Sequence, residues 1–379
     1  MEFEAIVVGG GINGLCTARA LVQHGLKRIA IIEAHFIGHS NGSSHGFSRI
    51  TRSAYSDALF VRLMQQAHNY EWPELEKDLK EQLLFPCKGL FFGDSAGHIN
   101  QYAQAVQNAG AQVDLITHNQ AQQLFPQFRF QSNDTILSDK TAGLLAASKI
   151  CLGLKHWLKE NQVTILEHEK VLECEIGGPS VKIQTTHTKL KAQGAIFCAG
   201  PWTSELFPYL KDKMHTSHQH VFYWNLDNPT CGTLNQFPVW VEIGKTHLDN
   251  WYGLPSFGSQ GIKAARHNLS SNDNPNTSPE LTEELTKQSL DKIQRRLYPK
   301  ITSLANWEPC KYTVTKNEDF IWTKHKQDPR VIIGAGFSGH GFKLAPITGA
   351  ALAAMLLNTE DPFYEFQKAK FQFSIKTSG

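Results

Sequence analysis

The sequence predicts an α/β fold into which an antiparallel sheet is inserted. A strand–turn–helix–strand pattern opens the chain over residues 4–33, and strand-like and helix-like segments alternate along the rest. A second set of strand-like runs in the second half interrupts this alternation. Because 379 residues are more than usually fold around one hydrophobic core, we expect two domains.

The first elements follow from short apolar runs and glycines. A buried parallel strand is expected at residues 4–8, which lead into three glycines. A helix is expected at residues 12–24, where apolar residues recur at helical spacing until Gly25 stops it. The next strand covers residues 29–32, and Glu33 stands at its carboxyl end.

The later elements follow from the same signals. Residues 41–48 are rich in Gly, Ser and His and are expected to form a loop, whereas residues 59–80 are expected to be helical. A charged amphipathic helix is expected at 279–298, and a small-residue helix at 345–357. Strands are expected at residues 90–92, 163–166, 171–176, 195–198, 221–224, 239–243, 262–265 and 330–335.

Composition and charge indicate an ordinary globular protein in the cytoplasm. The formal net charge of +2 gives no reason to expect nucleic acid or an anionic membrane as a partner. The longest weakly polar run, residues 344–357, is too short to span a bilayer. The seven cysteines are scattered singly, as in a reducing compartment. No room for a signal peptide precedes Gly9, and residues 376–379 are not a peroxisomal address.

Residues 9–14, Gly-Gly-Gly-Ile-Asn-Gly, satisfy the GxGxxG pattern of dinucleotide-binding turns. The pattern alone is weak, but here a strand precedes it and a helix follows. Gly9 allows the tight turn, Gly11 lets the backbone approach a pyrophosphate, and Gly14 lets helix and strand pack closely. The pyrophosphate is expected at the helix amino terminus, and Glu33 is expected to accept hydrogen bonds from ribose hydroxyls. The motif does not distinguish FAD from NAD.

Four further segments carry a family resemblance. They are residues 41–55 (Asn-Gly-Ser-Ser-His-Gly-Phe-Ser-Arg-Ile-Thr-Arg-Ser-Ala-Tyr), 252–258 (Tyr-Gly-Leu-Pro-Ser-Phe-Gly) with 261–267 (Gly-Ile-Lys-Ala-Ala-Arg-His), 310–313 (Cys-Lys-Tyr-Thr) and 336–343 (Gly-Phe-Ser-Gly-His-Gly-Phe-Lys). In this order they resemble the monomeric sarcosine oxidase family of FAD-dependent amine oxidases, which includes N-methyltryptophan and pipecolate oxidases. Family members commonly carry Asp and Thr where this chain has Phe47 and Ser48, and an acidic residue where it has Trp322.

The resemblance implies the domain organisation and the cofactor. It implies FAD, held by a discontinuous domain of glutathione-reductase-like type over residues 1–85, 143–214 and 317–379. A mainly antiparallel substrate domain, residues 86–142 and 215–316, is expected to cover the flavin. The protein is expected to be a monomer whose partners are a small amino-acid substrate and O2.

Cys310 is the residue to which the resemblance gives the most specific role. A lone cysteine is most often a small buried hydrophobe. Its Cys-Lys-Tyr-Thr setting, however, is similar to that of the cysteine that carries FAD through an 8α-thioether in this family. Lys311 beside it is expected to lower the pKa of the thiol.

Four cations in the matched segments have implied roles, although most Arg and Lys side chains simply face solvent. Arg52 and Lys343 are expected to hold the substrate carboxylate. Arg49 is expected to lie against the flavin ring. Lys263 occupies the position of the family lysine that contacts the flavin and activates oxygen, where a fixed cation stabilises developing superoxide.

The remaining implied site residues are pocket walls and cofactor contacts. Tyr252, Tyr312, His267 and His340 are expected to line the pocket, although each is also explained as a hydrogen-bonded core residue. The turn at residues 339–341 is expected near the flavin pyrimidine. Further expected cofactor contacts are Ile12, Asn13, Ala34, Ser43, Ser44, His45, Val171, Gly200, Trp202, Gly339 and Gly341.

A histidine cluster raises the question of a metal site. His215, His218 and His220 form an H-x2-H-x-H pattern, and on a strand the last two share a face. No fourth ligand stands out in the sequence, and flavin chemistry requires no metal. We therefore expect none.

The implied activity is oxidation of the C–N bond of a secondary α-amino acid, N-methylated or cyclic, to an imine, with reduction of O2 to H2O2. Two alternatives stay open. A flavin dehydrogenase would oxidise a related amine but pass the electrons to a carrier protein. A flavin-binding protein without turnover would be yellow but would not be bleached by any amine.

Overall fold

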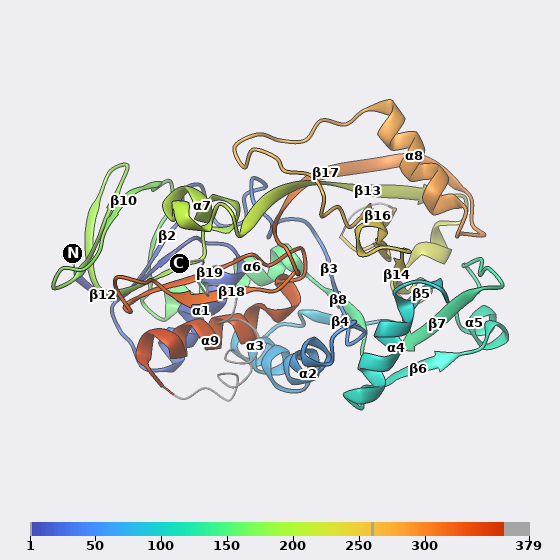
Figure 1. The fold of residues 1–379 in the computed structure, drawn as a ribbon, viewed down its shortest axis with the longest axis horizontal. Coiled ribbons are helices and arrows are strands. Elements are labelled where there is room, and N and C mark those ends of the chain that lie inside the picture. The colour runs from blue at the N-terminus through green and yellow to red at the C-terminus, as the bar shows by residue number, and fades with distance from the viewer. Residues whose placement is uncertain (1, 259–260, 360–379) are drawn as a thin grey trace.

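The computed structural model describes residues 2–258 and 261–359. Two large sheets lie side by side, and a small three-stranded sheet lies between them (Figure 1). The small sheet consists of β3 (Arg49–Thr51), β4 (Leu84–Pro86) and β8 (Gly143–Leu145). The expected α/β fold with an antiparallel sheet is confirmed.

The first large sheet is built on parallel strands. Its central strand β1 (Glu2–Val8) pairs in parallel with β2 (Ile29–Ile32) and β12 (Lys189–Phe197), and β9 (Thr164–Leu166) and β19 (Val331–Ala335) extend it. All residues of β2 and β19 are buried, as in parallel strands covered on both faces. The antiparallel strands of this sheet are β10 (Val171–Glu175), β11 (Val181–Thr185) and β18 (Ile321–Lys324).

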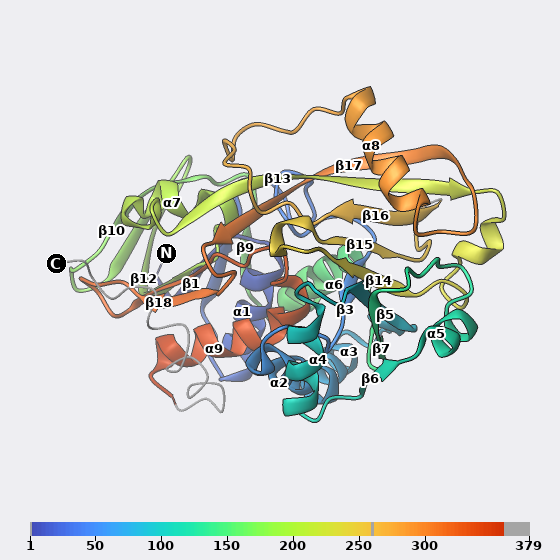
Figure 2. The same cartoon turned by 45° about the vertical axis from the view of Figure 1, so that its right-hand side comes forward.

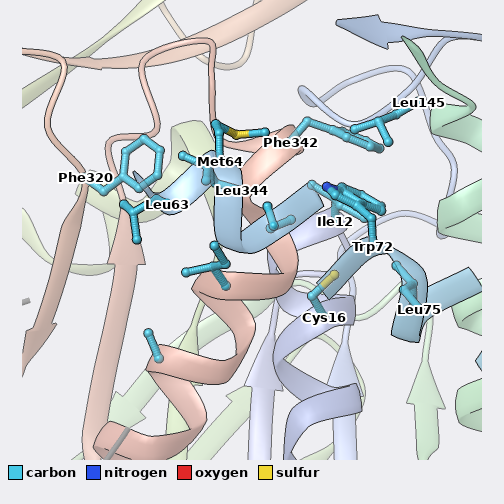
Figure 3. Packing of buried hydrophobic residues seen from close by; sticks show 14 of the residues in the cluster. Ile12, Cys16, Leu63, Met64, Trp72, Leu75, Leu145, Phe320, Phe342 and Leu344 are labelled. Carbon is cyan, nitrogen blue, oxygen red and sulfur yellow. The ribbon is translucent and has the colours of Figure 1, made fainter. Parts of the chain in front are cut away.

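Helices cover one face of this sheet. The helix α1 (Ile12–Gln23) packs against both α6 (Ala147–Glu160) and α9 (Ala345–Leu357). A side chain at Gly349 of α9 would overlap the backbone of Cys16, so these two helices lie in direct backbone contact. Figure 3 shows part of this core, in which Trp72 lies close to Ile12.

The expected helix at 59–80 is confirmed with one irregularity. It consists of α2 (Ala58–Gln66) and α3 (Trp72–Leu79), joined by a π-helical turn at Ala67–Glu71. The indole of Trp72 donates a 3.0 Å hydrogen bond to the carbonyl oxygen of Lys343. This buried bond ties α3 to the turn that precedes α9.

The second large sheet is mainly antiparallel, and one strand pair links it to the first. The long strands β13 (Met214–Leu226) and β17 (Ile301–Thr315) pair along their lengths and run from the side of the first sheet across the second (Figures 1 and 2). Its other strands are β5 (Gly89–Asp94), β6 (Val113–Ile116), β7 (Asp134–Asp139), β14 (Val239–Ile243), β15 (Trp251–Leu254) and β16 (Ile262–Arg266).

Some elements differ from the expectation. The charged helix α8 spans only Glu283–Gln294, because Thr282 caps it by accepting a hydrogen bond from the N–H of Leu285. The strand expected at 221–224 lies in the second half of β13, which begins seven residues earlier, at Met214. Elements not expected include α4 (Ile99–Asn108), α5 (His118–Leu124) and α7 (Thr203–Leu206).

The domain boundaries stay a prediction, and residues 360–379, with the final four residues considered above, lie outside the described part. All seven cysteines are free. Within residues 2–258 and 261–359, no helix combines the length and apolar character that crossing a membrane requires.

Candidate active site

One large cavity joins the amino-terminal glycine turn to the matched segments. Its volume is about 980 Å³, and its lining comes from both large sheets and from the loops between them. All but two of the expected site residues line it; the exceptions are Gly14 and His45. The lining includes Gly9, Gly11, Ile12, Asn13, Glu33, Ala34, Ser43, Ser44, Arg49, Arg52, Val171, Gly200, Trp202, Tyr252, Lys263, His267, Cys310, Tyr312, Gly339, His340, Gly341 and Lys343.

The glycine turn brings β1, α1 and β12 into close contact. Gly9 has φ +106°, and a side chain there would overlap the carbonyl of Cys198. A side chain at Gly14 would overlap the carbonyl of Gly9. Gly14 therefore acts from behind the cavity, where it lets α1 pack on the turn.

The amino terminus of α1 faces the cavity, and few protein groups pair with its N–H groups or offset its partial positive charge. Gly11 caps α1 without a side-chain hydrogen bond, and no acidic residue lies in the first turn. The N–H of Ile12 donates to Ser44 Oγ at 3.0 Å. Asn13 Oδ1 is buried and has no hydrogen-bond partner among the described residues. This helix end is suited to an anionic group such as a pyrophosphate.

Glu33 is buried at the end of β2 and is held by three donors. Its Oε2 accepts the N–H of Gly10 at 2.7 Å, and its Oε1 accepts the N–H of His35 at 2.9 Å and lies 3.3 Å from His39 Nε2. Burial alone would raise the pKa of Glu33, but these hydrogen bonds hold it below its ordinary value. Because each carboxylate oxygen has further acceptor capacity, the group remains able to receive a ribose hydroxyl. The turn, the helix end and this carboxylate together fit the ADP half of FAD.

Two cations line the opposite part of the cavity, the buried Lys343 and the half-buried Arg52. The Arg52 guanidinium lies 4.0 Å from the centre of the Tyr55 ring, and its Nη1 is buried without a partner among the described residues. Lys343 is 4% exposed, and its ammonium makes one 3.5 Å hydrogen bond within the described residues, to the carbonyl of His340, and lies 5.9 Å from the centre of the Tyr55 ring. Burial, followed by Arg52 and Arg49, lowers the pKa of Lys343 well below its ordinary value. No described carboxylate pairs with either cation, so this part of the cavity is built for an anion.

Lys263 is a second buried cation, and Arg49 is half-buried like Arg52. Lys263 is 2% exposed and donates to the carbonyl of Ser48 at 2.8 Å. Burial, together with Arg49, lowers the pKa of Lys263 to about 7, against a smaller opposing effect of Glu308. The Arg49 guanidinium is fixed by the carbonyls of Ser43 and His45, at 2.9 and 2.6 Å.

Cys310 lies buried on β17 and lines the cavity. Neighbouring residues of a strand point to opposite faces, and the ammonium of Lys311 donates to the carbonyl of Pro275 at 2.6 Å. Lys311 is thus engaged with another loop, and its expected effect on the Cys310 thiol stays a prediction.

The expected aromatic walls gather around Gly339. Tyr312 and His267 have ring centres 5.2 Å apart. Gly339 has φ +77°, and a Cβ there would approach the Tyr312 ring to 2.5 Å, so only glycine leaves room for this ring.

Two of the expected histidines are committed to the protein. His340 bonds the carbonyl of Glu318 at 2.9 Å through Nε2 and the Tyr55 hydroxyl at 3.3 Å through Nδ1. Burial, with Lys343 nearby, lowers the pKa of His340 to about 3. His45 lies behind the lining, where its Nε2 contacts the carbonyl of Pro309 at 2.8 Å. Both therefore support the site rather than titrate in it.

Among the cavity residues that the sequence did not predict are Glu318 and Tyr55. Glu318 has φ +59°, and its carboxylate lies 3.3 Å from His267 Nε2. The polar stretch around it predicts only a turn, so the sequence carries no signal for its place in the cavity. Tyr55, which lies under the Arg52 guanidinium, ends one of the matched segments and was therefore within reach of the same reasoning.

The three histidines of β13 do not converge. His215 Nε2 bonds the carbonyl of Leu269 at 3.0 Å, and His220 Nε2 bonds that of Glu280 at 2.8 Å. His218 lies 3.8 Å from Asp273. Over the described ranges, no group of three His, Cys, Asp or Glu side chains is arranged to hold a metal ion.

Comparison with known proteins gives consistent relatives over nearly the full length. The FAD dependent oxidoreductase family matches residues 4–355. The peroxisomal sarcosine oxidase of Mus musculus is 32% identical over 92% of this chain and 91% of its own length. The monomeric sarcosine oxidase of Arthrobacter sp. (strain TE1826) is 27% identical over 93% of this chain and 92% of its own. The N-methyl-L-tryptophan oxidase of Yersinia pestis (strain Pestoides F) is 26% identical over 98% of this chain and 100% of its own.

Solved structures share the fold. NikD, an unusual amino acid oxidase essential for nikkomycin biosynthesis, superimposes with a TM-score of 0.80 at 18% identity, covering 95% of each chain. The glycine oxidase of Geobacillus kaustophilus gives 0.78 at 14% identity, covering 95% of this chain and 96% of its own.

Proposed function

The chain belongs to the FAD dependent oxidoreductase family, and from this premise we propose that it is an FAD-dependent oxidase of secondary α-amino acids. The reaction converts the C–N bond of an N-methylated or cyclic amino acid to an imine and reduces O2 to H2O2. The observation that carries this proposal is the pair of cations Arg52, whose Nη1 is buried, and Lys343, which is buried as a whole, in the cavity that the glycine turn also lines.

The two cations supply the binding group for a substrate carboxylate. A planar guanidinium with a buried, unpartnered Nη1 and a compact ammonium together offer directional and non-directional contacts. Leaving the buried ammonium of Lys343 and the buried Nη1 of Arg52 without an anion is costly, so a carboxylate that contacts both binds favourably. The aromatic ring of Tyr55 under Arg52 keeps water from that face of the guanidinium.

The same cations assist the chemistry at the substrate nitrogen. The amine must be uncharged to donate electrons, and nearby positive charges oppose its protonation. Bound FAD would supply the acceptor of the two electrons and pass them on to oxygen. The residues that would hold it are those of the glycine turn, Glu33 and the Ser43–Ser44 loop, with Arg49 and Lys263 toward the ring.

Lys263 favours oxygen as the acceptor over a carrier protein. Electron transfer to neutral oxygen creates superoxide, and a buried cation at that point stabilises the new charge. Lys263 is buried beside Arg49, away from the surface that a carrier protein would contact.

Cys310 is the proposed attachment point of FAD. Its Sγ would hold the cofactor in a thioether at the 8α carbon. Forming that bond removes the thiol proton and one C–H hydrogen, two protons and two electrons in total, and bound FAD would supply their acceptor. The purified protein is therefore expected to stay yellow after acid precipitation, whereas Cys310→Ser releases FAD into the supernatant. A wild-type protein, expressed with ample flavin, that releases all its FAD contradicts the covalent bond.

Anaerobic flavin bleaching tests the proposed function. Sarcosine, larger N-methyl amino acids and cyclic imino acids are each added to the purified protein, with the matching amines that lack a carboxylate as controls. We expect bleaching only by the carboxylated compounds. A yellow protein that no amine bleaches would be a binding protein without turnover. Bleaching without oxygen consumption on readmission of air would instead identify a dehydrogenase.

A further inference from the structure

His39 lies where the carboxylate at the end of β2 meets the loop that faces the helix α1. Its side chain is only 13% exposed, and it lines the cavity. Its Nε2 lies 3.3 Å from Glu33 Oε1. The other ring nitrogen, Nδ1, accepts the N–H of Asn41 at 3.0 Å.

These two contacts define one tautomer. Because Nδ1 accepts a hydrogen bond from the backbone of Asn41, the proton of the neutral ring is on Nε2, and it points to Glu33. A single neutral imidazole therefore satisfies both partners. The other titratable groups nearby are His35, whose ring centre lies 4.8 Å away, and His45 in the following loop.

The loop that His39 fixes carries its own contacts to the cofactor half of the cavity. Asn41 is followed by Gly42, Ser43 and Ser44, all of which line the cavity, and Ser44 Oγ accepts the N–H of Ile12 at the start of α1. His39 thus connects the ribose-binding carboxylate to the phosphate-facing helix end through two hydrogen bonds.

We propose that His39 is a positioning residue of the cofactor site, which holds Glu33 and the 41–44 loop in the arrangement that receives the ADP half of FAD. The proposal rests on the proposed FAD binding and extends it to a residue that the glycine motif does not include. If His39 positions the ADP half of the site, a substitution of His39 must weaken the binding of FAD and of ADP by the same factor.

The test uses the full chain with Cys310→Ser, so that binding is reversible, and measures Kd for FAD and for ADP by titration calorimetry. His39→Leu removes both contacts and is expected to weaken FAD and ADP by the same factor, about tenfold or more. His39→Gln, which keeps a donor long enough for Glu33, is expected to recover part of this loss. His156→Leu is the matched control, because His156 is 76% exposed on α6.

The outcomes distinguish a failure of the proposed His39 role from a failure of the proposed FAD binding. Unchanged Kd values in His39→Leu overturn the inference, as does a loss confined to FAD with ADP unaffected. If His39→Leu does not fold, His39→Asn replaces it, since asparagine reaches the Asn41 N–H but not Glu33; unchanged ADP binding then overturns the role. A parent chain that binds neither ligand contradicts the proposed function itself.

Discussion

The two halves of the cavity are built on opposite electrostatic principles. In the ADP half, Glu33 is buried with three hydrogen-bond donors from the protein, and burial is compensated so fully that its pKa falls. In the substrate half, Lys343 and Lys263 are buried with one carbonyl each, and burial lowers both pKa values.

The difference distinguishes a binding site whose polar groups are already paired within the protein from one whose cations still lack an anion. Polar groups satisfied within the protein fix a shape that any FAD molecule fits. Buried cations without counter-ions instead store an unfavourable energy that only the correct anion removes. Substitutions in the first half should therefore affect folding and FAD together, and those in the second should affect ligands while sparing the fold.

The largest expected effect is in the ADP half. Gly14→Ala places a methyl group onto the carbonyl of Gly9, which forces α1 away from the turn. We expect a protein that retains no FAD and unfolds at a markedly lower temperature, with a cost on the order of 3 kcal/mol. Gly178→Ala is the control, since the nearest atom to a Cβ there lies at 3.7 Å. Retention of FAD by Gly14→Ala would show that the turn is not rigid.

The next largest effect is expected in the half of the cavity that holds the buried cations. Lys263→Met should slow reoxidation of the reduced flavin by about 10²–10³-fold, because one preorganised charge is lost where superoxide develops. Anaerobic reduction by substrate should change much less. Stopped-flow measurement of both half-reactions decides this, with Lys149→Met, a half-exposed lysine of α6, as the control. Unchanged reoxidation would assign Lys263 to structure alone.

A third effect concerns the carboxylate site. Arg52→Ala and Lys343→Met should each weaken binding of a carboxylate inhibitor by about tenfold or more, the equivalent of roughly 1.5–3 kcal/mol. Flavin content should stay unchanged. Lys343→Met should also melt no lower than wild type, because it removes a buried charge without a partner. Inhibitor titration with thermal unfolding of the same samples measures both, and an unaltered Kd in Arg52→Ala places the carboxylate elsewhere.

The smallest effect is a pH dependence of stability. The pKa of Lys263 is about 7 in the folded chain and 10.5 ordinarily, so between these values the unfolded chain binds the extra proton. Lys263 should therefore contribute about 2 kcal/mol to a rise in the stability of the flavin-free protein between pH 7 and pH 9. Lys343, whose pKa is also lowered, should add to this rise. Denaturant unfolding at both pH values measures the rise, which Lys263→Met should reduce. An identical rise in that variant would trace it to other groups.

The two halves of the cavity also differ in how far the sequence predicts them. The glycine turn and Glu33 lie within 25 residues of each other, so their geometry follows from one strand, one turn and one helix. The cations of the substrate half come from segments hundreds of residues apart. They were identified through the family resemblance, because no local pattern states that Arg52 and Lys343 share a cavity.

The sequence did not predict residues and element ends that lie outside the glycine motif and the segments of the family resemblance. Glu318 reaches the cavity from a polar turn that resembles any surface loop. The sequence predicts β13 only over its apolar second half, because His215 and His218 in the first half do not alternate with apolar residues. The helix α8 was expected too long, because periodicity continues past the point where Thr282 and Gln294 end the helical hydrogen bonds.

The contact between α1 and α9 imposes an order on the synthesis of the protein. α1 is synthesised before β19, the Lys343 turn and α9, which follow it along the chain with most of the described elements in between. Until they emerge, the face of α1 that packs on α9 and the edge of β12 that pairs with β19 have no cover, and the nascent chain offers these surfaces to chaperones or to other chains. The flavin site is accordingly completed only after α9 has been made, because two helices far apart in the sequence must meet before the cavity is closed.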